Sequence, residues 1–134
     1  MLFKDKCEEH GLKITPQRTV IYDEISYSKE HPTANKIYEK VKKKLPNISF
    51  DTVNRTLLSF SKMGLIHIVE SSGDARRFDP DLEAHHHLRC VACNNIVDFK
   101  EKIFDDLVVP ARIKKKFKVT HKKVVLEGLC GKCQ

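Results

Sequence analysis

The segment HHHLRCVACNNIVDF, residues 85–99, carries the most specific signal in this chain. It contains one Cys-x-x-Cys pair, Cys90 and Cys93, and a second pair follows at Cys130 and Cys133. Two such pairs can supply four thiolates to one tetrahedral Zn²⁺, and a closed site of this kind is structural because no coordination position is left for a substrate. The alternatives are a redox motif, which needs only one pair, and two disulfides. Both pairs lie on turn-like sequence, so we predict a structural zinc that joins the two ends of a small α/β unit.

The sequence around these pairs predicts an α+β unit. Residues 87–91 and 96–99 read as paired strands around the first cysteine pair, 101–116 as a helix, and 118–129 as a final strand that leads to the second pair. Strand edges of such a unit are commonly covered by a second copy, so we expect a homodimer.

The first half of the chain predicts helices followed by a hairpin. One helix opens at Pro16, the next follows the N-cap Thr33, and a third begins after Ser49 and stops at Gly64. Residues 65–69 and 75–78 alternate around Ser71-Ser72-Gly73-Asp74, which predicts a β-hairpin. Helices followed by a hairpin describe a winged helix.

A winged helix places its third helix in the major groove of DNA. Here the residues off the apolar stripe of that helix are Asp51, Thr52, Asn54, Arg55 and Ser59. The chain of 134 residues has a net charge of +7, which favours a polyanionic partner. A helical face of this composition is also compatible with plain solvent surface, so the helix alone does not decide the function.

A second set of metal donors surrounds the histidine triplet. On a strand, residues two apart point the same way, so His85 and His87 can face one ion while His86 points elsewhere. Asp98 lies on the adjacent predicted strand, and His31 and Asp79 precede the triplet. Imidazoles with carboxylates suit Fe²⁺, Mn²⁺ or Zn²⁺ better than Ca²⁺ or Mg²⁺. Surface histidines without a metal are the alternative.

Composition bounds the remaining possibilities. No apolar run is long enough to span a bilayer and the first residues form no signal peptide, so we expect a soluble cytoplasmic protein. Cys7 is expected to be a half-buried, inert thiol on a first helix. The change of pattern at Pro80-Asp81 predicts a DNA-binding domain over residues 1–80, a hinge over 81–84, and a dimerisation and metal-binding domain over 85–134.

Several ordered motifs of this chain resemble those of the ferric uptake regulator (Fur) family, over nearly the whole length. They are GLKITPQR at 11–18, HPTA at 31–34, RFD at 77–79, the His85-x-His87 pair, IVDF at 96–99 and both cysteine pairs. The resemblance implies a DNA-binding repressor that works as a homodimer on a double-stranded operator, an AT-rich inverted repeat. It also implies structural Zn²⁺ on the four cysteines and a regulatory Fe²⁺ or Mn²⁺ on His31, Asp79, His85, His87 and Asp98.

Aspartate at position 98, where the iron-sensing branch usually has glutamate, and at position 79 makes the chain similar to the peroxide-sensing branch. That branch loses DNA when Fe²⁺ reacts with H₂O₂ and a ligand histidine is oxidised, whereas Mn²⁺ supports repression without oxidation. We therefore expect a peroxide-sensing repressor whose DNA contacts include Lys13, Thr52, Asn54 and Arg55. A Fur-type iron or other metal sensor is the nearest alternative.

The chain departs from the family pattern in two regions. Asn54 stands where a tyrosine is usual and Asp51 where a small residue is usual, and an acid beside phosphates should weaken DNA binding. An additional metal site of some members is expected to be absent, since its ligand positions hold Ala84, His86, Asp105 and Lys122.

Two alternatives come from other functional classes. A metal-dependent hydrolase could use an open His/Asp site to activate water, but the sequence offers no obvious general base beside it. A zinc-stabilised RNA-binding module would need exposed stacking aromatics, and this chain has no tryptophan.

Overall fold

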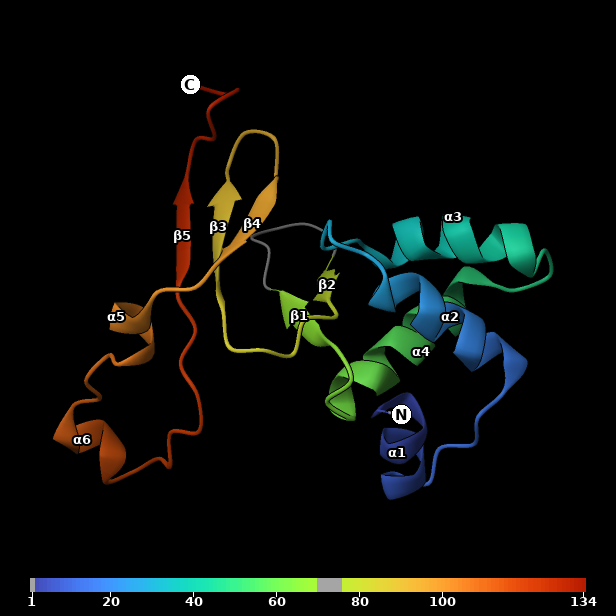
Figure 1. Cartoon of the computed structure of the whole chain (residues 1–134), viewed down its shortest axis with the longest axis horizontal. Helices are drawn as coiled ribbons and strands as arrows, with labels where there is room; N and C mark the ends of the chain where they lie inside the picture. Colours follow the sequence, from blue (N-terminus) through green and yellow to red (C-terminus); the bar gives the residue numbers. More distant parts are fainter. Residues whose placement is uncertain (1, 70–75) are drawn as a thin grey trace. The chain divides into compact units, whose positions relative to one another are not determined.

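The computed structural model describes residues 2–69 and 76–134, and it divides the chain into two compact units, Met1–Leu82 and Glu83–Gln134 (Figure 1). The boundary between the units falls within the stretch 81–84 that the sequence predicts to be a hinge. The N-terminal unit contains α1 (Leu2–Glu9), α2 (Pro16–Ser26), α3 (Ala34–Lys44), α4 (Phe50–Lys62), β1 (His67–Val69) and β2 (Arg77–Asp79).

Side-chain caps begin three of these helices at the predicted positions. The hydroxyls of Thr15, Thr33 and Ser49 each accept a hydrogen bond from the backbone N–H three residues later, at 3.2, 3.2 and 3.1 Å. Pro16 follows the first cap, where its missing N–H costs no hydrogen bond. Gly64 has φ +76° after α4, a conformation that glycine adopts without strain. The local sequence therefore sets the helix boundaries.

The core of the N-terminal unit lies between α2, α3 and α4. Its fully buried side chains recur at helical spacing, as predicted, and include Ile21, Ile25, Ile37, Val41, Val53, Leu57 and Phe60. Helix α1 joins this core through Phe3, which stacks on Tyr22 at a ring-centroid distance of 4.5 Å. Cys7 is only 1% exposed, more than the half burial predicted, and burial raises the pKa of its thiol. Cys7 is therefore an inert core residue.

The predicted hairpin of the N-terminal unit is present. Strand β1 pairs with β2 antiparallel, with Ile68 opposite Phe78. The turn at Ser71-Ser72-Gly73-Asp74 lies outside the described residues. Helices α2–α4 followed by this hairpin form the winged-helix arrangement that the sequence predicts.

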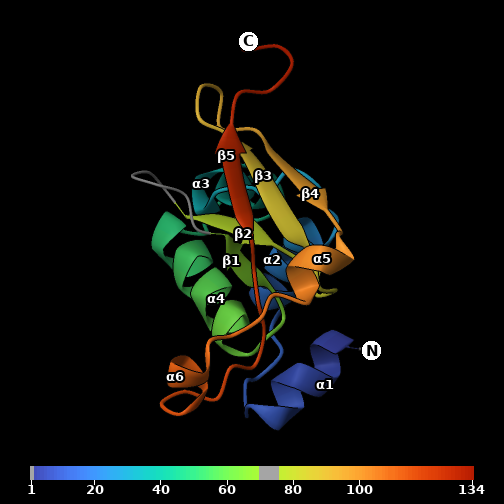
Figure 2. The ribbon, with the colours of Figure 1, turned by 90° about the vertical axis from the view of Figure 1, so that its left-hand side faces the viewer.

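The C-terminal unit is built on a three-stranded sheet. Its strands are β3 (His86–Cys90), β4 (Ile96–Phe99) and β5 (Val125–Gly128), in the order β4-β3-β5. Strand β3 lies in the middle, antiparallel to β4 and parallel to β5 (Figure 2). The long connection from β4 to β5 carries α5 (Lys102–Asp105) and α6 (Ala111–Lys114). The fold class is therefore α+β, as predicted.

Two element predictions in this unit are wrong. The single helix expected over 101–116 is two four-residue helices, α5 and α6. Pro110 stands directly before α6 and prevents a continuous helix, because it lacks a backbone N–H and disfavours helical geometry in the residue before it, but α5 already ends at Asp105. The strand expected over 118–129 is limited to β5, because β5 pairs only with residues 87–90 of β3. None of the helices in the described part of the chain has the length and apolar character needed to cross a membrane.

Candidate metal centres and DNA-binding surface

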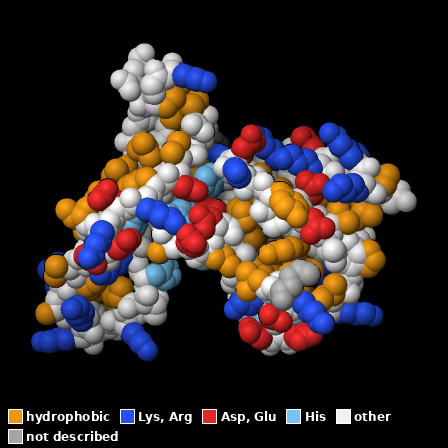
Figure 3. Space-filling view, in the orientation of Figure 1, with side chains coloured by type: hydrophobic (Ala, Val, Ile, Leu, Met, Phe, Trp, Pro, Cys, Tyr) orange, Lys and Arg blue, Asp and Glu red, His pale blue; other side chains and the backbone are white. Residues whose placement is uncertain are grey.

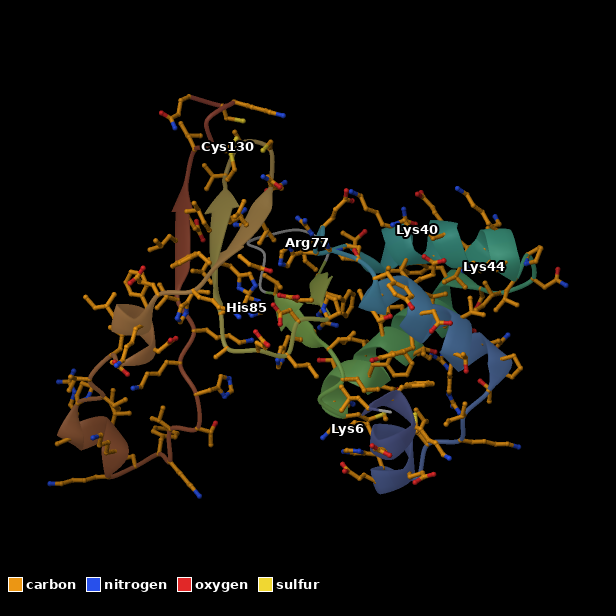
Figure 4. All side chains as sticks on the ribbon, in the orientation of Figure 1. Lys6, Lys40, Lys44, Arg77, His85 and Cys130 are labelled. Carbon is orange, nitrogen blue, oxygen red and sulfur yellow. The ribbon has the colours of Figure 1, made fainter. Side chains whose placement is uncertain are left out.

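The four predicted zinc ligands meet at one end of the three-stranded sheet. The sulfur atoms of Cys90, Cys93, Cys130 and Cys133 all lie within 4.8 Å of one another. Figure 4 shows these sulfurs gathered at Cys130, between the end of β5 and the loop that joins β3 to β4. Because β3 and β5 run parallel, with Cys90 opposite Gly128, both cysteine pairs lie at the same end of the sheet.

Backbone hydrogen bonds shape both cysteine loops. The N–H of Asn94 donates to the carbonyl of Cys90 at 2.9 Å, and the N–H of Cys133 donates to the carbonyl of Cys130 at 3.0 Å. Asn94 has φ +62°, a left-handed conformation that asparagine tolerates better than most residues. Arg89 donates to the Asn94 side-chain oxygen at 3.1 Å and supports this loop from β3.

The thiols differ strongly in acidity. Hydrogen bonds from the backbone N–H of Cys130 and then of Cys93 lower the pKa of Cys90 to about 6. Hydrogen bonding with the side chain of Cys130, and then with those of Cys90 and Cys93, raises the pKa of Cys133 to about 12. Because the four thiols lie so close together, Cys133 keeps its proton in the metal-free state. A divalent cation that binds the four sulfurs would displace this proton.

The sulfur spacing fits zinc. In a tetrahedral site with Zn–S bonds of about 2.3 Å, neighbouring sulfurs are about 3.8 Å apart. The sulfurs of Cys93 and Cys130 are 3.8 Å apart. Four cysteines that enclose one point suit structural Zn²⁺ and leave no position for a substrate.

Three of the predicted regulatory ligands come together in the C-terminal unit. The register of β3 and β4 places His87 opposite Asp98, and their Nε2 and Oδ1 atoms are 3.3 Å apart. His85 precedes β3, and its Nε2 lies 3.1 Å from Nε2 of His87 and 3.6 Å from Oδ1 of Asp98. Two imidazoles and one carboxylate converge here, a donor set that suits iron or manganese.

A backbone carbonyl orients the His85 ring. Nδ1 of His85 is 2.6 Å from the carbonyl oxygen of Glu83, which can only accept a hydrogen bond, so Nδ1 carries the proton. In the neutral ring, Nε2 then carries the lone pair, and it is Nε2 that faces His87 and Asp98. This is the outer hydrogen bond that metal-ligating histidines commonly make.

The remaining two predicted ligands pair within the N-terminal unit. Nε2 of His31 lies 3.4 Å from Oδ2 of Asp79, and both side chains are buried. Asp79 is the last residue of β2, and one of its carboxylate oxygens accepts a hydrogen bond from the N–H of Asp81 at 2.9 Å. The structure thus holds the five predicted donors as a pair in one unit and a triad in the other.

The sequence did not predict a role for His86, which is 1% exposed. Its Nδ1 accepts a hydrogen bond from the N–H of Val124 at 3.1 Å, so Nε2 carries the proton and donates to Oδ1 of Asp105 at 2.7 Å. The rings of Phe99 and Phe104 pack against the imidazole. His86 therefore links β3 to α5 and to the residues before β5. The sequence indicated that its side chain turns away from its two neighbours, and the family resemblance placed His86 and Asp105 at two positions of an additional metal site, but neither indicated this structural role.

The predicted DNA-binding residues lie mainly on α4. Arg55 and Asp51 are exposed and form an ion pair of 2.9 Å across one helical turn. Asn54 is partly exposed, as is Thr52, whose hydroxyl is 2.9 Å from that of the cap residue Ser49. Lys13 is exposed in the segment between α1 and α2, and its carbonyl accepts a hydrogen bond from Arg18 at 2.6 Å.

Positive charge is also concentrated on α3. The last turn of this helix contains Lys42, Lys43 and Lys44. Figure 3 shows Lys and Arg side chains along the α3 side of the N-terminal unit. Because α3 is part of the winged helix, its clustered lysines can attract DNA phosphates independently of base sequence.

Comparisons with known proteins agree with this geometry. A sequence profile of the ferric uptake regulator family matches residues 9–127. The peroxide-responsive repressor PerR of Staphylococcus epidermidis is 35% identical over 124 residues, which cover 92% of this chain and 83% of that protein. Among solved structures, the Campylobacter jejuni peroxide stress regulator matches with a TM-score of 0.71 and 28% identity, covering 99% of this chain and 100% of that one.

The ferric uptake regulator of Helicobacter pylori has the same fold, with a TM-score of 0.77 at 22% identity over 98% of this chain and 88% of that one. The family profile and the Staphylococcus relative both span most of the sequence. The chain belongs to the ferric uptake regulator family, whose members are dimeric DNA-binding repressors that respond to metal ions and are not enzymes.

Proposed function

We propose that this chain is a peroxide-sensing repressor, in which one regulatory Fe²⁺ or Mn²⁺ is bound by His31, Asp79, His85, His87 and Asp98. The observation that carries the proposal is the triad in the C-terminal unit, with His85, His87 and Asp98 within 3.6 Å of one another. Two histidines and one carboxylate form the donor set that non-haem Fe²⁺ prefers, and that set leaves coordination positions open.

The proposed ligand set couples metal to DNA because its members come from different parts of the chain. His31 and Asp79 belong to the winged-helix unit, whereas the triad belongs to the C-terminal unit. An ion bound by both sets favours the arrangement in which all five donors reach it, by its higher affinity for that state. Loss of the ion, or of one ligand, then releases the DNA.

Peroxide sensing follows from the choice of metal. A bound Fe²⁺ would activate H₂O₂, so that one peroxide oxygen is added to a ring carbon of a ligand histidine and the other leaves as water; the histidine ring, not the iron, supplies the two electrons overall. Mn²⁺ does not react in this way, so the manganese form keeps its donors.

The C-terminal unit supports the dimer that this function needs. Val97, Leu88 and Leu126 face one another across the three strands, and they are 51%, 44% and 43% exposed. A continuous apolar row on one face of a sheet is a typical protein-protein contact. We propose that a second copy of the chain covers it, which would give a twofold protein for an operator with inverted-repeat symmetry, expected to be AT-rich.

The test compares the iron-loaded and manganese-loaded protein. We expect H₂O₂ to abolish the gel shift of the iron form on the promoter of its own gene, and peptide mass spectrometry to find one added oxygen on His31 or His85. The manganese form should stay bound to DNA after H₂O₂ treatment, and its peptides should show no added oxygen. Asp98→Glu should retain metal-dependent DNA binding with less oxidation, since the carboxylate stays but is displaced by one methylene.

The same experiment separates the nearest alternative. If oxygen is found only on Met63 or on cysteines, or equally with Mn²⁺, the chain is a metal-responsive regulator of the Fur type without peroxide sensing.

A further inference from the structure

The backbone at His31 has an unusual conformation. His31 has φ +51°, and of the described residues other than glycine only Asn94 shares a positive φ. Side chains with a Cβ seldom adopt this region, and the proline that follows at position 32 favours extended backbone at His31. Such a conformation persists only where the surrounding structure holds it, and it is typical of functional positions.

Arg77 holds this backbone from the neighbouring strand. Its Nε donates a hydrogen bond to the carbonyl oxygen of His31, and its Nη2 donates to the carbonyl oxygen of Glu30 at 2.9 Å. These are two consecutive carbonyls, and the fork of donors on one planar guanidinium binds both.

The same strand fixes the residues that follow. The N–H of Phe78 donates to the carbonyl of Pro32 at 2.9 Å, and Thr33 forms an isolated antiparallel bridge with Arg77. Strand β2 thus contacts the backbone along the whole segment from Glu30 to Thr33.

Arg77 and Asp79 are two residues apart on β2. While Arg77 binds the backbone of His31, the carboxylate of Asp79 lies 3.4 Å from its imidazole. Strand β2 therefore contacts His31 in two places: Arg77 binds its main-chain carbonyl, and Asp79 lies beside its imidazole.

We propose that Arg77 is a positioning residue for the regulatory metal: it holds the left-handed backbone of His31 so that the imidazole is presented beside Asp79 before any ion binds. This inference rests on the proposed function, because it takes His31 and Asp79 as ligands. Lysine cannot replace arginine fully, since an ammonium group lacks the planar fork that binds two carbonyls at once.

The experiment uses the full-length, zinc-loaded protein and measures Mn²⁺ affinity by competition with a fluorescent chelator. Arg77→Ala should weaken Mn²⁺ binding roughly 10- to 100-fold, the usual effect of removing a group that orients a metal ligand. Arg77→Lys should give an intermediate loss. Arg76→Ala is the matched control: it removes the same charge from the adjacent, exposed position and should leave the affinity unchanged.

A double-mutant cycle separates positioning from general destabilisation. In a His31→Gly background the ligand is gone and glycine accepts a positive φ, so Arg77→Ala should change the remaining Mn²⁺ affinity by no more than about twofold. The structural zinc content, measured by elemental analysis, should stay at the wild-type level in every variant.

Three results would overturn the inference: unchanged affinity in Arg77→Ala and Arg77→Lys, an equal loss with and without His31, or loss of zinc together with Mn²⁺. If His31→Gly alone leaves Mn²⁺ affinity unchanged, the proposed regulatory site itself is wrong. The two failures are therefore distinguishable.

Discussion

Asp51 on α4 offers a direct test of the DNA-binding surface. Its carboxylate pairs with Arg55 at 2.9 Å, and the two side chains are 66% and 78% exposed. If α4 enters the major groove, this acid both repels phosphates and occupies the guanidinium that would contact DNA. We predict that Asp51→Asn binds DNA more tightly than the wild type.

The size of the effect follows from the geometry. The exposed ion pair contributes about 0.3–0.5 kcal/mol, and the position of Asp51 in the first turn of α4 about 0.3–1 kcal/mol, so the variant should lose at most about 1.5 kcal/mol and remain folded. One additional phosphate contact per protomer steepens the dependence of log K on log salt by about 0.9, hence by about 1.8 for a dimer. The advantage of Asp51→Asn should therefore shrink about twelvefold when salt rises fourfold.

Fluorescence anisotropy with a labelled promoter duplex and a shuffled duplex, at several salt concentrations, measures both quantities. Glu9→Gln is the matched control, because Glu9 is also an exposed helical acid, paired with Lys6 at 3.6 Å. Glu9→Gln should show neither tighter DNA binding nor a steeper dependence of log K on log salt. Equal or weaker binding by Asp51→Asn, or a gain with an unchanged slope, would refute the reasoning and show that Arg55 does not reach phosphates from α4.

Other predictions address the remaining sites. Arg55→Ala and Lys13→Ala should lower DNA affinity without changing metal content; Arg55→Ala should alter sequence choice as well as the salt slope, and Lys13→Ala should mainly reduce the salt slope, by about 0.9 per protomer and hence about 1.8 for a dimer, and unchanged binding in both would place the interface elsewhere. Cys93→Ser or Cys133→Ser should lose zinc and give an unfolded or monomeric C-terminal unit, whereas Cys7→Ala should keep its zinc; a folded dimer without zinc would contradict the Cys₄ assignment. In metal-free protein, the pKa of Cys90 is lowered to about 6, so its contribution to the free energy of unfolding should be lost as pH falls from about 9 to 6. The pKa of Cys133 is raised to about 12, so its contribution should be lost as pH rises from about 9 to 12. Urea unfolding of the metal-free protein from about pH 6 to about pH 12 measures both losses of stability. Cys90→Ser should not show the loss on the acidic side.

The N-terminal unit could be predicted well because its signals are local. Each cap acts within three residues, and the buried stripe of α4 is set by helical spacing within that helix. A pattern that acts within one element can be read without knowing the tertiary structure. The winged-helix arrangement then follows from the order of the elements.

The connection from β4 to β5 could not be predicted in the same way. Ile103, Leu107 and Val108 recur at nearly helical spacing, which favours one long helix, yet they are 68%, 45% and 89% exposed. Phe104 packs on Phe99 and His86, but no continuous apolar stripe of this segment is buried among the described residues, so tertiary packing does not favour one long helix. The length of β5 likewise depends on its partner strand, which the local sequence does not specify.

In the candidate sites, too, residues whose spacing is local could be predicted from the sequence, and residues whose partners are distant could not. Paired spacing indicated the four cysteines and the His85-x-His87 pair, because ligands two or three residues apart on one loop or strand are neighbours by local geometry. The contacts of Arg77 with His31, 46 residues away, and of His86 with Asp105, 19 residues away, have no signal in the local spacing. Groups that orient ligands are harder to predict than the ligands because their contacts are non-local.

Strand β3 connects the two candidate metal sites of the C-terminal unit. It carries His87 and, three residues later, Cys90, and the four cysteines hold the ends of β3 and β5 together. A slip of one residue between β3 and β4 would turn Asp98 to the opposite face from His87, because side chains alternate along a strand. Cys90 ends β3 and Cys93 lies in the loop from β3 to β4, so we expect a zinc on the four cysteines to hold this loop at a fixed length. In a sheet of only three short strands, we therefore expect this zinc to help keep the β3–β4 register that brings His87 beside Asp98.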